Sequence, residues 1–231
     1  MKIGFFTDAH YSSALVTCGN RYNSKSLEKI KKAYECFKLE NVDLVICLGD
    51  LTDTEKTHDK EIENLREIAD VIQLSGLKTI CVMGNHDGFC YTAHEFYGIL
   101  RGCKPENTVR DGKNFVFVDA CYFQNGRHYE PGDSDWTDTF YPYVSELESH
   151  LESINGDTYV FLHQNIDVGI REDHRVKNAS EICEILEKNG NVKFVFQGHY
   201  HPGYKSQKNG VEYVTFPAMC SEENGWYITE L

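Results

Sequence analysis

Residue types that bind metal ions in proteins follow five short apolar runs of this sequence, at the point where each run ends. The runs are rich in Val, Ile and Phe, which is typical of buried strands. Polar residues directly after a strand lie at the carboxyl edge of a parallel sheet, where ligands collect. The candidate ligands are Asp8 and His10 after the first run, Asp50 after the second, Asn85 after the third, His163 after a later run, and His199 and His201 after the last. Carboxylate, amide and imidazole groups brought together in this way predict a metal centre.

Each of these short motifs has an ordinary structural explanation when it is taken alone. Asp-x-His and Gly-Asp are common turn sequences, and a single histidine such as His163 is usually a hydrogen-bonded structural residue. His199 and His201 form a more specific pair, because residues i and i+2 of an extended segment point to the same side. Turn statistics do not readily explain why all five strand ends carry ligand types.

The number of candidate ligands predicts two metal ions. One zinc ion takes three or four protein ligands, and the candidates exceed that number. In a two-metal site the ions lie about 3.5–4 Å apart, share a bridging group and clamp both the attacking and the leaving oxygens of an in-line displacement. Asp50 is the natural carboxylate bridge. Imidazole, carboxylate and amide ligands without cysteine favour Mn, Fe or Zn over Mg or Ca.

The composition disfavours several other classes of protein. The 231 residues carry 36 acidic and 23 basic side chains, a formal charge of −13. Without a Lys/Arg-rich run, this charge makes nucleic acid an unfavoured partner, whereas a small phosphorylated substrate is compatible because bound metal ions reverse the local field. No stretch approaches the ~18 apolar residues of a membrane helix, so no membrane partner is expected. The nine cysteines are widely spaced and odd in number, which indicates reduced thiols and a cytoplasmic location.

The elements that must position the candidate ligands alternate between strands and helices. Strands are predicted at 2–7, 43–48, 78–83, 115–118, 158–162 and 193–197, and helices at 26–39, 62–74, 144–154 and 179–189. The β-α-β-α-β order at the start implies a parallel sheet with right-handed crossovers. Three further strands, 203–208, 211–216 and 226–230, are predicted as an antiparallel tail, the first two joined by an Asn209-Gly210 hairpin turn.

The predicted fold class is α/β, a four-layer α-β-β-α sandwich in which two mixed sheets pack face to face with helices outside. The length favours a single domain over residues 1–231 with no separate cap domain. One long irregular segment, 121–143, is rich in aromatic residues, and loops of this length tend to be functional. Its rings either hold the loop down as a satellite cluster or stack on a nucleobase, and we expect at least one of them to line the substrate pocket.

The motifs together resemble a known superfamily. Asp8-x-His10, Gly49-Asp50, Gly84-Asn85-His86-Asp87, His163 and Gly198-His199-x-His201 are similar, in order and spacing, to the five signature blocks of the calcineurin-like metallophosphoesterases. The resemblance implies one ion held by Asp8, His10, Asp50 and His201 and a second held by Asp50, Asn85, His163 and His199. It further implies a metal-bridging hydroxide as nucleophile, with His86 beside the leaving group as general acid or charge stabiliser.

The stretch from Asn20 to Leu27 resembles one branch of this superfamily, which includes the ADP-ribose/CDP-alcohol diphosphatases and related cyclic-nucleotide phosphodiesterases. Those diphosphatases carry Gln where this chain has His10. The predicted substrate contacts are Arg21, Tyr22 and Tyr200, and the alternative for Arg21 is a surface position before a helix. Asp53 and Asp87 are predicted either to orient an imidazole from behind the ligands or to be solvated turn acids.

The resulting hypothesis is a dinuclear metal-dependent phosphohydrolase that cleaves small phosphodiester, phosphomonoester or nucleotide-diphosphate substrates. One alternative is a catalytically silent scaffold or binding protein of the same fold, because fold does not imply function. A decayed site should have lost ligands or His86, whereas every expected position is filled here. The other alternative is a nuclease of the superfamily, against which the acidic charge speaks.

Overall fold

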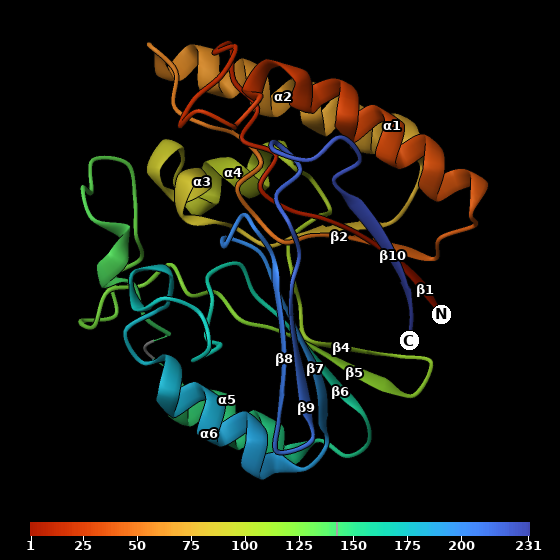
Figure 1. Cartoon of the computed structure of the whole chain (residues 1–231), viewed down its shortest axis with the longest axis vertical. Helices are drawn as coiled ribbons and strands as arrows, with labels where there is room; N and C mark the ends of the chain where they lie inside the picture. The colour runs from red at the N-terminus through yellow and green to blue at the C-terminus, as the bar shows by residue number, and fades with distance from the viewer. Residues whose placement is uncertain (142) are drawn as a thin grey trace.

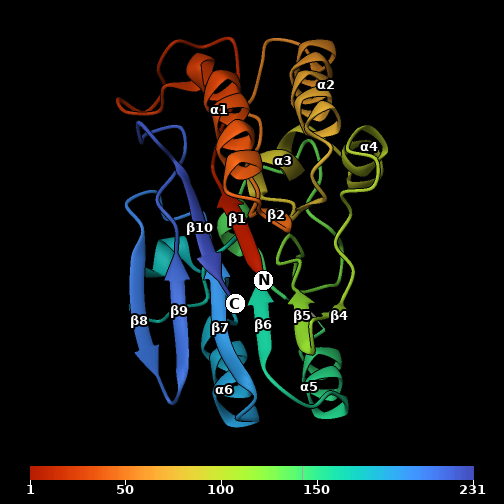
Figure 2. The same cartoon turned by 90° about the vertical axis from the view of Figure 1, so that its right-hand side faces the viewer.

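The computed structural model describes residues 1–141 and 143–231, in which the strands form two sheets. The first sheet has the order β10-β1-β2-β3. Its parallel members are β1 (Lys2–Phe6), β2 (Leu44–Cys47) and β3 (Thr79–Cys81), and β10 (Trp226–Glu230) runs antiparallel beside β1. The crossovers contain α1 (Ser26–Leu39), which follows the short η1 (Asn23–Lys25), and α2 (His58–Ser75). These two helices cover the outer face of the sheet (Figures 1 and 2).

The second sheet has the order β4-β5-β6-β7-β9-β8. Its strands are β4 (Thr108–Arg110), β5 (Lys113–Phe117), β6 (Thr158–Phe161), β7 (Val192–Gln197), β8 (Tyr204–Lys208) and β9 (Val211–Thr215). The helices α5 (Val144–Ser153) and α6 (Ala179–Asn189) cover its outer face, opposite to α1 and α2 (Figure 1). The helix α6 ends at Asn189 and is followed by Gly190, which adopts the left-handed conformation with φ of 75° that is typical after a helix end.

Three apolar clusters separate the four layers. Aromatic rings from both sheets meet between them, as in the Phe5–Phe196 pair at 4.9 Å between ring centroids and the Phe5–Phe161 pair at 6.3 Å. A second cluster joins α1 and α2 to the first sheet, and a third joins α5 and α6 to the second sheet. The predicted four-layer α-β-β-α sandwich is confirmed.

The structure supplies the partners of the last strands, which the sequence left open. β8 and β9 form the expected antiparallel hairpin, β9 also pairs parallel to β7, and β10 pairs antiparallel to β1 in the first sheet. Hairpin signals fix only neighbouring strands and leave the partner on the other side open. The helices α3 (Asn85–Cys90) and α4 (Ala93–Ile99) and the strand β4 were missed, since each is too short to show a period.

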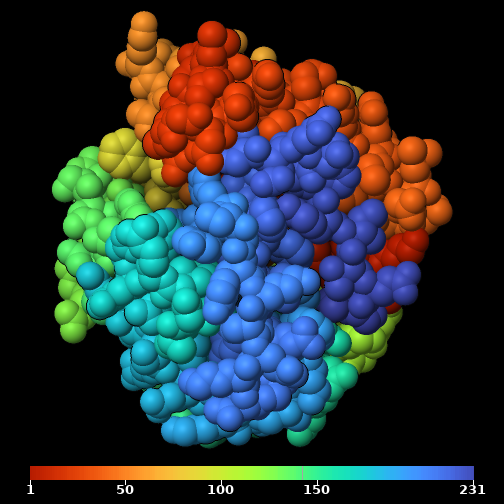
Figure 3. All heavy atoms as spheres, viewed as in Figure 1, coloured from red at the N-terminus to blue at the C-terminus, as the bar shows by residue number. Residues whose placement is uncertain are grey.

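The described part of the long segment, 121–141, follows β5 and contains the short helix η2 (Trp136–Asp138). Pro142, within the long segment 121–143, lies outside the described residues. Figure 3 shows the segment in green on one side of the molecule, next to the cyan residues that follow β6. Of the helices in the described ranges, none is long and apolar enough to span a membrane.

Candidate metal centre and active site

The structure brings the predicted ligands together at one edge of the sheet pair. Asp8 and His10 follow β1, Asp50 follows β2 and Asn85 begins α3, whereas His163 follows β6 and His199 and His201 follow β7. The first four come from one sheet and the last three from the other. Six of these side chains are buried, and His201 is half-buried with 16% of its side chain exposed. Polar groups are buried at this density only where they have a specific role.

Four of these residues have an unusual backbone conformation. The φ angles of Asp8, His10, Asp50 and His199 lie between 47° and 66°, in the left-handed region that non-glycine residues rarely adopt. Such conformations cost about 1–3 kcal/mol each and persist where the surrounding structure enforces them. The strain is therefore concentrated on the turns that carry the candidate ligands.

Asp8 shows how one oxygen of a ligand carboxylate is fixed while the other is left open. Its Oδ2 accepts hydrogen bonds from the Thr7 hydroxyl at 2.6 Å and from the backbone N–H of His199 at 2.9 Å. Its Oδ1 is buried without a hydrogen-bond partner, and Nε2 of His201 lies 3.3 Å from it. Burial acts to raise the pKa of Asp8, but the neighbouring imidazoles of His10 and His201 hold it well below its ordinary value. The carboxylate of Asp8 is therefore ionised, as a candidate metal ligand must be.

His163 is oriented by a backbone group. Its Nδ1 donates to the carbonyl oxygen of Leu48 at 2.6 Å, which turns the buried Nε2 toward Oδ2 of Asp50 at 3.2 Å. Metal-binding histidines typically donate their second N–H in this way. Burial lowers the pKa of His163, but the charges of Asp50 and Asp8 raise it to about 10, so a cation must displace a proton to bind Nε2.

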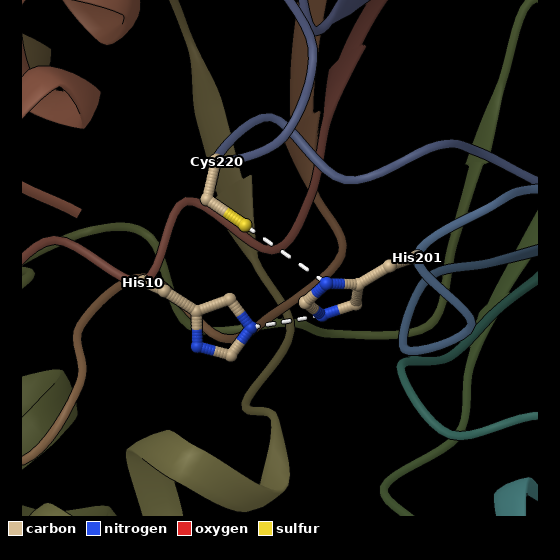
Figure 4. A group of neighbouring side chains, drawn as sticks. All are labelled: His10, His201 and Cys220. Atoms are coloured by element: carbon tan, nitrogen blue, oxygen red, sulfur yellow. Dashed lines mark hydrogen bonds between the residues drawn. The ribbon is translucent and has the colours of Figure 1, made fainter. Parts of the chain in front are cut away.

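His10 and His201 face each other across the centre (Figure 4). Their Nε2 atoms are 3.1 Å apart, about the separation of two nitrogens that each lie ~2.0–2.1 Å from one ion. Burial, together with the charge of His86, lowers the pKa of His10 to about 4, which leaves its imidazole neutral and able to act as a ligand. Cys220 completes this group, with Sγ 4.0 Å from Nδ1 of His201.

Asp50 lies between the two halves of the site. Its Oδ1 accepts the backbone N–H of His86 at 2.8 Å, and its Oδ2 lies within 3.6 Å of Nε2 of His10 as well as beside His163. Asp50 belongs to two of the three groups of closely spaced ligand atoms in the described residues, one with His10 and one with His163 and His199. Burial acts to raise its pKa, but His163 and His86 lower it far below the ordinary value. The carboxylate is placed to serve two ions.

Buried ligand atoms without hydrogen-bond partners indicate whether this set of residues fits metal ions. Buried polar atoms in native proteins are nearly always hydrogen-bonded. Four ligand atoms of this centre have no partner in the described structure: Asp8 Oδ1, Asn85 Oδ1, His163 Nε2 and His199 Nε2. Their mixture of oxygen and nitrogen donors suits Mn, Fe or Zn. The residues present therefore fit metal ions.

One residue that is not a candidate ligand, Asp53, supports His86. Asp53 accepts a hydrogen bond from Nδ1 of His86 at 3.0 Å and lies 3.7 Å from Nδ1 of His10, which agrees with the prediction that it orients an imidazole. Burial lowers the pKa of His86, but Asp50 and Asp53 raise it by more, so its net pKa is above the ordinary value. Arg21 lies 3.8 Å from the same Asp53 carboxylate.

Asp87 has a role that neither sequence interpretation anticipated. It is buried, and its two oxygens accept the backbone N–H groups of Leu51 at 2.9 Å and Gly84 at 3.0 Å. It therefore joins the turn after β2 to the start of α3, where a carboxylate is favoured by the helix N-terminus. It touches no imidazole in the described contacts and is not a solvated turn acid.

A cavity of about 290 Å³ opens over the centre. Arg21 and Tyr200 line it as predicted, together with His86 and Trp136 of the long segment. Tyr22 does not line it but faces a separate depression beside Lys25. The predicted substrate contact of Tyr22 stays a prediction, and the structure places its side chain away from this cavity.

Glycines allow the strand ends to approach each other closely. A Cβ atom on Gly84 would lie 2.2 Å from Oδ1 of Asp50, and one on Gly198 would lie 2.1 Å from Oγ1 of Thr7. Only glycine fits at these two contacts. Sequence reasoning treated these glycines as turn residues, and only the distance between strands reveals this role.

Sequence reasoning also missed residues that surround the ligands. Cys220 follows β9 within a few residues, so the strand-end argument could have included it. His174, which lines the cavity, had no motif. It lies in the connection after β6, where loop residues cannot be placed without long-range contacts.

The comparisons with known proteins agree with this geometry. The profile of the calcineurin-like phosphoesterases matches residues 1–203. A probable cyclic nucleotide phosphodiesterase of Fibrobacter succinogenes is 27% identical over 87% of this chain and 73% of its own length. A 3',5'-cyclic-nucleotide phosphodiesterase of Nostoc sp. is 24% identical over 78% of this chain, and the match spans 63% of the Nostoc protein.

Among solved structures, a dimetal phosphatase from Danio rerio superimposes with a TM-score of 0.86 at 15% identity, covering 100% of this chain and 92% of that one. At this identity the likeness shows the fold, and the profile match shows the family. The chain belongs to the calcineurin-like phosphoesterases, and it is a hydrolase of phosphoric esters with candidate ligands for the metal ions on which that family depends.

Proposed function

We propose that this protein hydrolyses small phosphodiester, phosphomonoester or nucleotide-diphosphate substrates at a dinuclear metal centre. Two sets of residues would hold the ions, with Asp50 shared between them. The first set is Asp8, His10, Asp50 and His201, and the second is Asp50, Asn85, His163 and His199. Ions bound there supply Lewis-acid activation of the phosphoryl group and of the attacking water. The observation that carries the proposal is the set of unpartnered ligand atoms that four strand ends direct to one buried centre.

We assign to His86 the role of assisting the departure of the leaving group. It lines the cavity, and its Nδ1 is committed to Asp53 at 3.0 Å, which leaves Nε2 for the substrate. The net rise in its pKa favours the protonated imidazole, so His86 can donate a proton to the departing oxygen or stabilise its charge. Asp53 holds the ring in place for this transfer.

Substrate size follows from the cavity. About 290 Å³ is near the lower end of the range for small-molecule sites and suits a nucleotide-sized ester. Arg21, half-buried beside the cavity, adds a positive charge that favours a phosphoryl group. The relatives named cyclic nucleotide phosphodiesterases support a substrate of this kind. We place the reaction in the cytoplasm, since the nine cysteines are free thiols.

The test combines metal analysis with a substrate panel. Purified protein loaded with Mn, Fe or Zn is assayed against p-nitrophenyl phosphate, bis-p-nitrophenyl phosphate, 3',5'-cyclic AMP, ADP-ribose, CDP-choline and single-stranded DNA. We expect about two ions per chain and a preference for one linkage among the small esters. Preferential cleavage of DNA would establish the nuclease alternative, and no metal with no turnover would establish the silent scaffold.

Two variants separate metal binding from chemistry. Asp50→Asn removes the shared carboxylate and should lose the metal ions. His86→Ala should keep them and lose turnover by about 100-fold or more. His94→Ala, on the exposed surface of α4, is the matched control and should behave as wild type. Activity that survives both Asp50→Asn and His86→Ala would refute the proposed mechanism.

A further inference from the structure

Aromatic rings gather on one wall of the cavity. The indole of Trp136 lies 4.3 Å from the imidazole of His199, centroid to centroid, at an interplanar angle of 73°. His174 lies 6.5 Å from Trp136 and 5.3 Å from Tyr200, in edge-to-face contact with both. Trp136, His174 and Tyr200 all line the cavity and are half-buried, so each keeps part of its surface open to it. We call these three residues the aromatic wall.

Trp136 is held in place although it lies in a long irregular segment. It begins η2, and the Asp135 side chain caps that turn by accepting the backbone N–H of Thr137 at 2.9 Å. Thr139, directly after η2, is buried and accepts hydrogen bonds from Gln164 and from the backbone N–H of Lys177. Gln164 itself follows the candidate ligand His163. These contacts tie the indole to the same strand end that positions the metal centre.

Other residues at the cavity have a different character. Arg21 and His86 line it and are joined through Asp53, whose carboxylate lies 3.8 Å from Arg21 and accepts a hydrogen bond from His86. The aromatic wall stands beside His199. A substrate whose phosphoryl group lies at the centre therefore has both charged groups and aromatic faces as neighbours. Indole and phenol rings bind planar rings by stacking, and Trp is the most effective of them.

We propose that Trp136 is a specificity-determining residue and that the substrate carries a planar heteroaromatic group, a purine or pyrimidine base, that stacks on the aromatic wall. This inference rests on the proposed function, since it places the phosphoryl group at the metal centre. It narrows the substrate class to nucleotides. It also gives a role to the long segment 121–143, whose Trp136 reaches the cavity while Phe123 of the same segment lines a different depression.

Tryptophan fluorescence tests whether the aromatic wall binds a base, and it does not require turnover. The chain has two tryptophans, Trp136 and Trp226 on β10, so Trp226→Phe leaves Trp136 as the single tryptophan emitter. AMP and ribose 5-phosphate are added to the metal-loaded variant, and the emission is read by stopped flow before hydrolysis. We expect saturable quenching by AMP and little change with ribose 5-phosphate, which carries the same phosphate without the base. Equal responses to the two ligands, or none to AMP, would overturn the proposal.

Kinetics provide the second measurement, with a matched pair of variants on the same loop. Trp136→Leu keeps an apolar group against His199 and removes the stacking face, and Phe123→Leu makes the same change away from the cavity. For the esters that wild type hydrolyses, Trp136→Leu should raise KM for the base-bearing substrate by roughly 5- to 150-fold, the range expected for loss of one base stack. The KM for its base-free analogue and the metal content should stay within about twofold. Phe123→Leu should leave both KM values unchanged.

The outcomes separate the two proposals. An equal loss with both analogues, or a loss of metal in Trp136→Leu, would show that Trp136 only supports His199 and would refute base stacking. Absence of hydrolysis of every substrate in wild type would refute the proposed function, whereas the AMP titration would still decide whether the wall binds a base.

Discussion

Replacing Gly84 by alanine tests how tightly the centre is packed. The added Cβ would lie 2.2 Å from Oδ1 and 2.5 Å from the backbone nitrogen of Asp50, where ordinary van der Waals contact begins at 3.4 Å. Either the turn after β2 or the start of α3 must therefore move by about 1 Å to remove the overlap. Both carry candidate ligands, because Asp50 lies in that turn and Asn85 directly follows Gly84.

The expected effects follow from that displacement. Overpacking of a rigid site costs about 1–3 kcal/mol, which for a chain of this length lowers Tm by about 2–12 °C. Displacement of reacting groups by ~1 Å reduces activity on the order of 100-fold. Differential scanning fluorimetry measures the first effect, and kcat/KM with metal content per chain measures the second. We expect loss of both metal affinity and activity in a protein that is still folded at 25 °C.

Gly98 offers a matched control on the neighbouring helix α4. A Cβ at this position meets no atom within 4 Å, and Ala is the better helix former, so Gly98→Ala should keep full activity with equal or greater stability. If Gly84→Ala retained its metal and its kcat/KM within twofold of wild type, the close approach of Gly84 to Asp50 would not constrain the site, and the reasoning would be refuted.

Three further perturbations test other contacts. Asp53→Asn removes a charge that raises the pKa of His86, so the alkaline limb of the kcat/KM profile should move to lower pH with metal content unchanged; an unmoved limb would exclude His86 as the acid. Thr7→Val removes the hydroxyl that donates a hydrogen bond to Oδ2 of Asp8 and should weaken metal binding by about 10- to 100-fold in a chelator competition. Unchanged metal affinity would show that this hydrogen bond does not orient Asp8. Burial lowers the pKa of His128, but its partner Asp119 raises it by more, so the net pKa lies above the ordinary histidine value. The pair therefore stabilises the segment 121–143 fully at pH values below the ordinary histidine pKa. This contribution is lost as the pH rises through the higher pKa of the folded protein. Thermal melts of wild type and Asp119→Asn should therefore converge as the solution becomes more alkaline, and a constant difference in Tm would contradict this assignment.

The ligand positions could be predicted because they depend on local signals. A parallel strand ends where its apolar run ends, and parallel strands bring these ends to a common edge. Asp8, Asp50 and His163 were therefore placed without any knowledge of distances. The four-layer arrangement followed from the same alternation of runs, because sheets with one helical face must bury the other.

The remaining features depend on contacts between distant segments. The position of Trp136 follows from the hydrogen bond between Thr139 and Gln164, and no local pattern encodes it. The parallel pairing of β9 with β7 likewise depends on which strand edge is free in the folded protein, and no local pattern predicts it. The sequence left Asp87 either to orient an imidazole or to be a solvated turn acid, and only the fold supplies the backbone amides of Leu51 and Gly84 that it binds. The contact with Gly84 also caps the start of the short helix α3.

The centre draws its candidate ligands from both sheets, Asp8 and Asp50 from one and His163 and His199 from the other. Ions bound there would cross-link the two sheets, so metal affinity and the stability of the core between them would be linked equilibria. Chelation should accordingly speed amide hydrogen exchange along β1 and β6 together. By the same linkage, loosening the core at Phe161, which ends β6 two residues before the candidate ligand His163, should make the protein release its metal more readily.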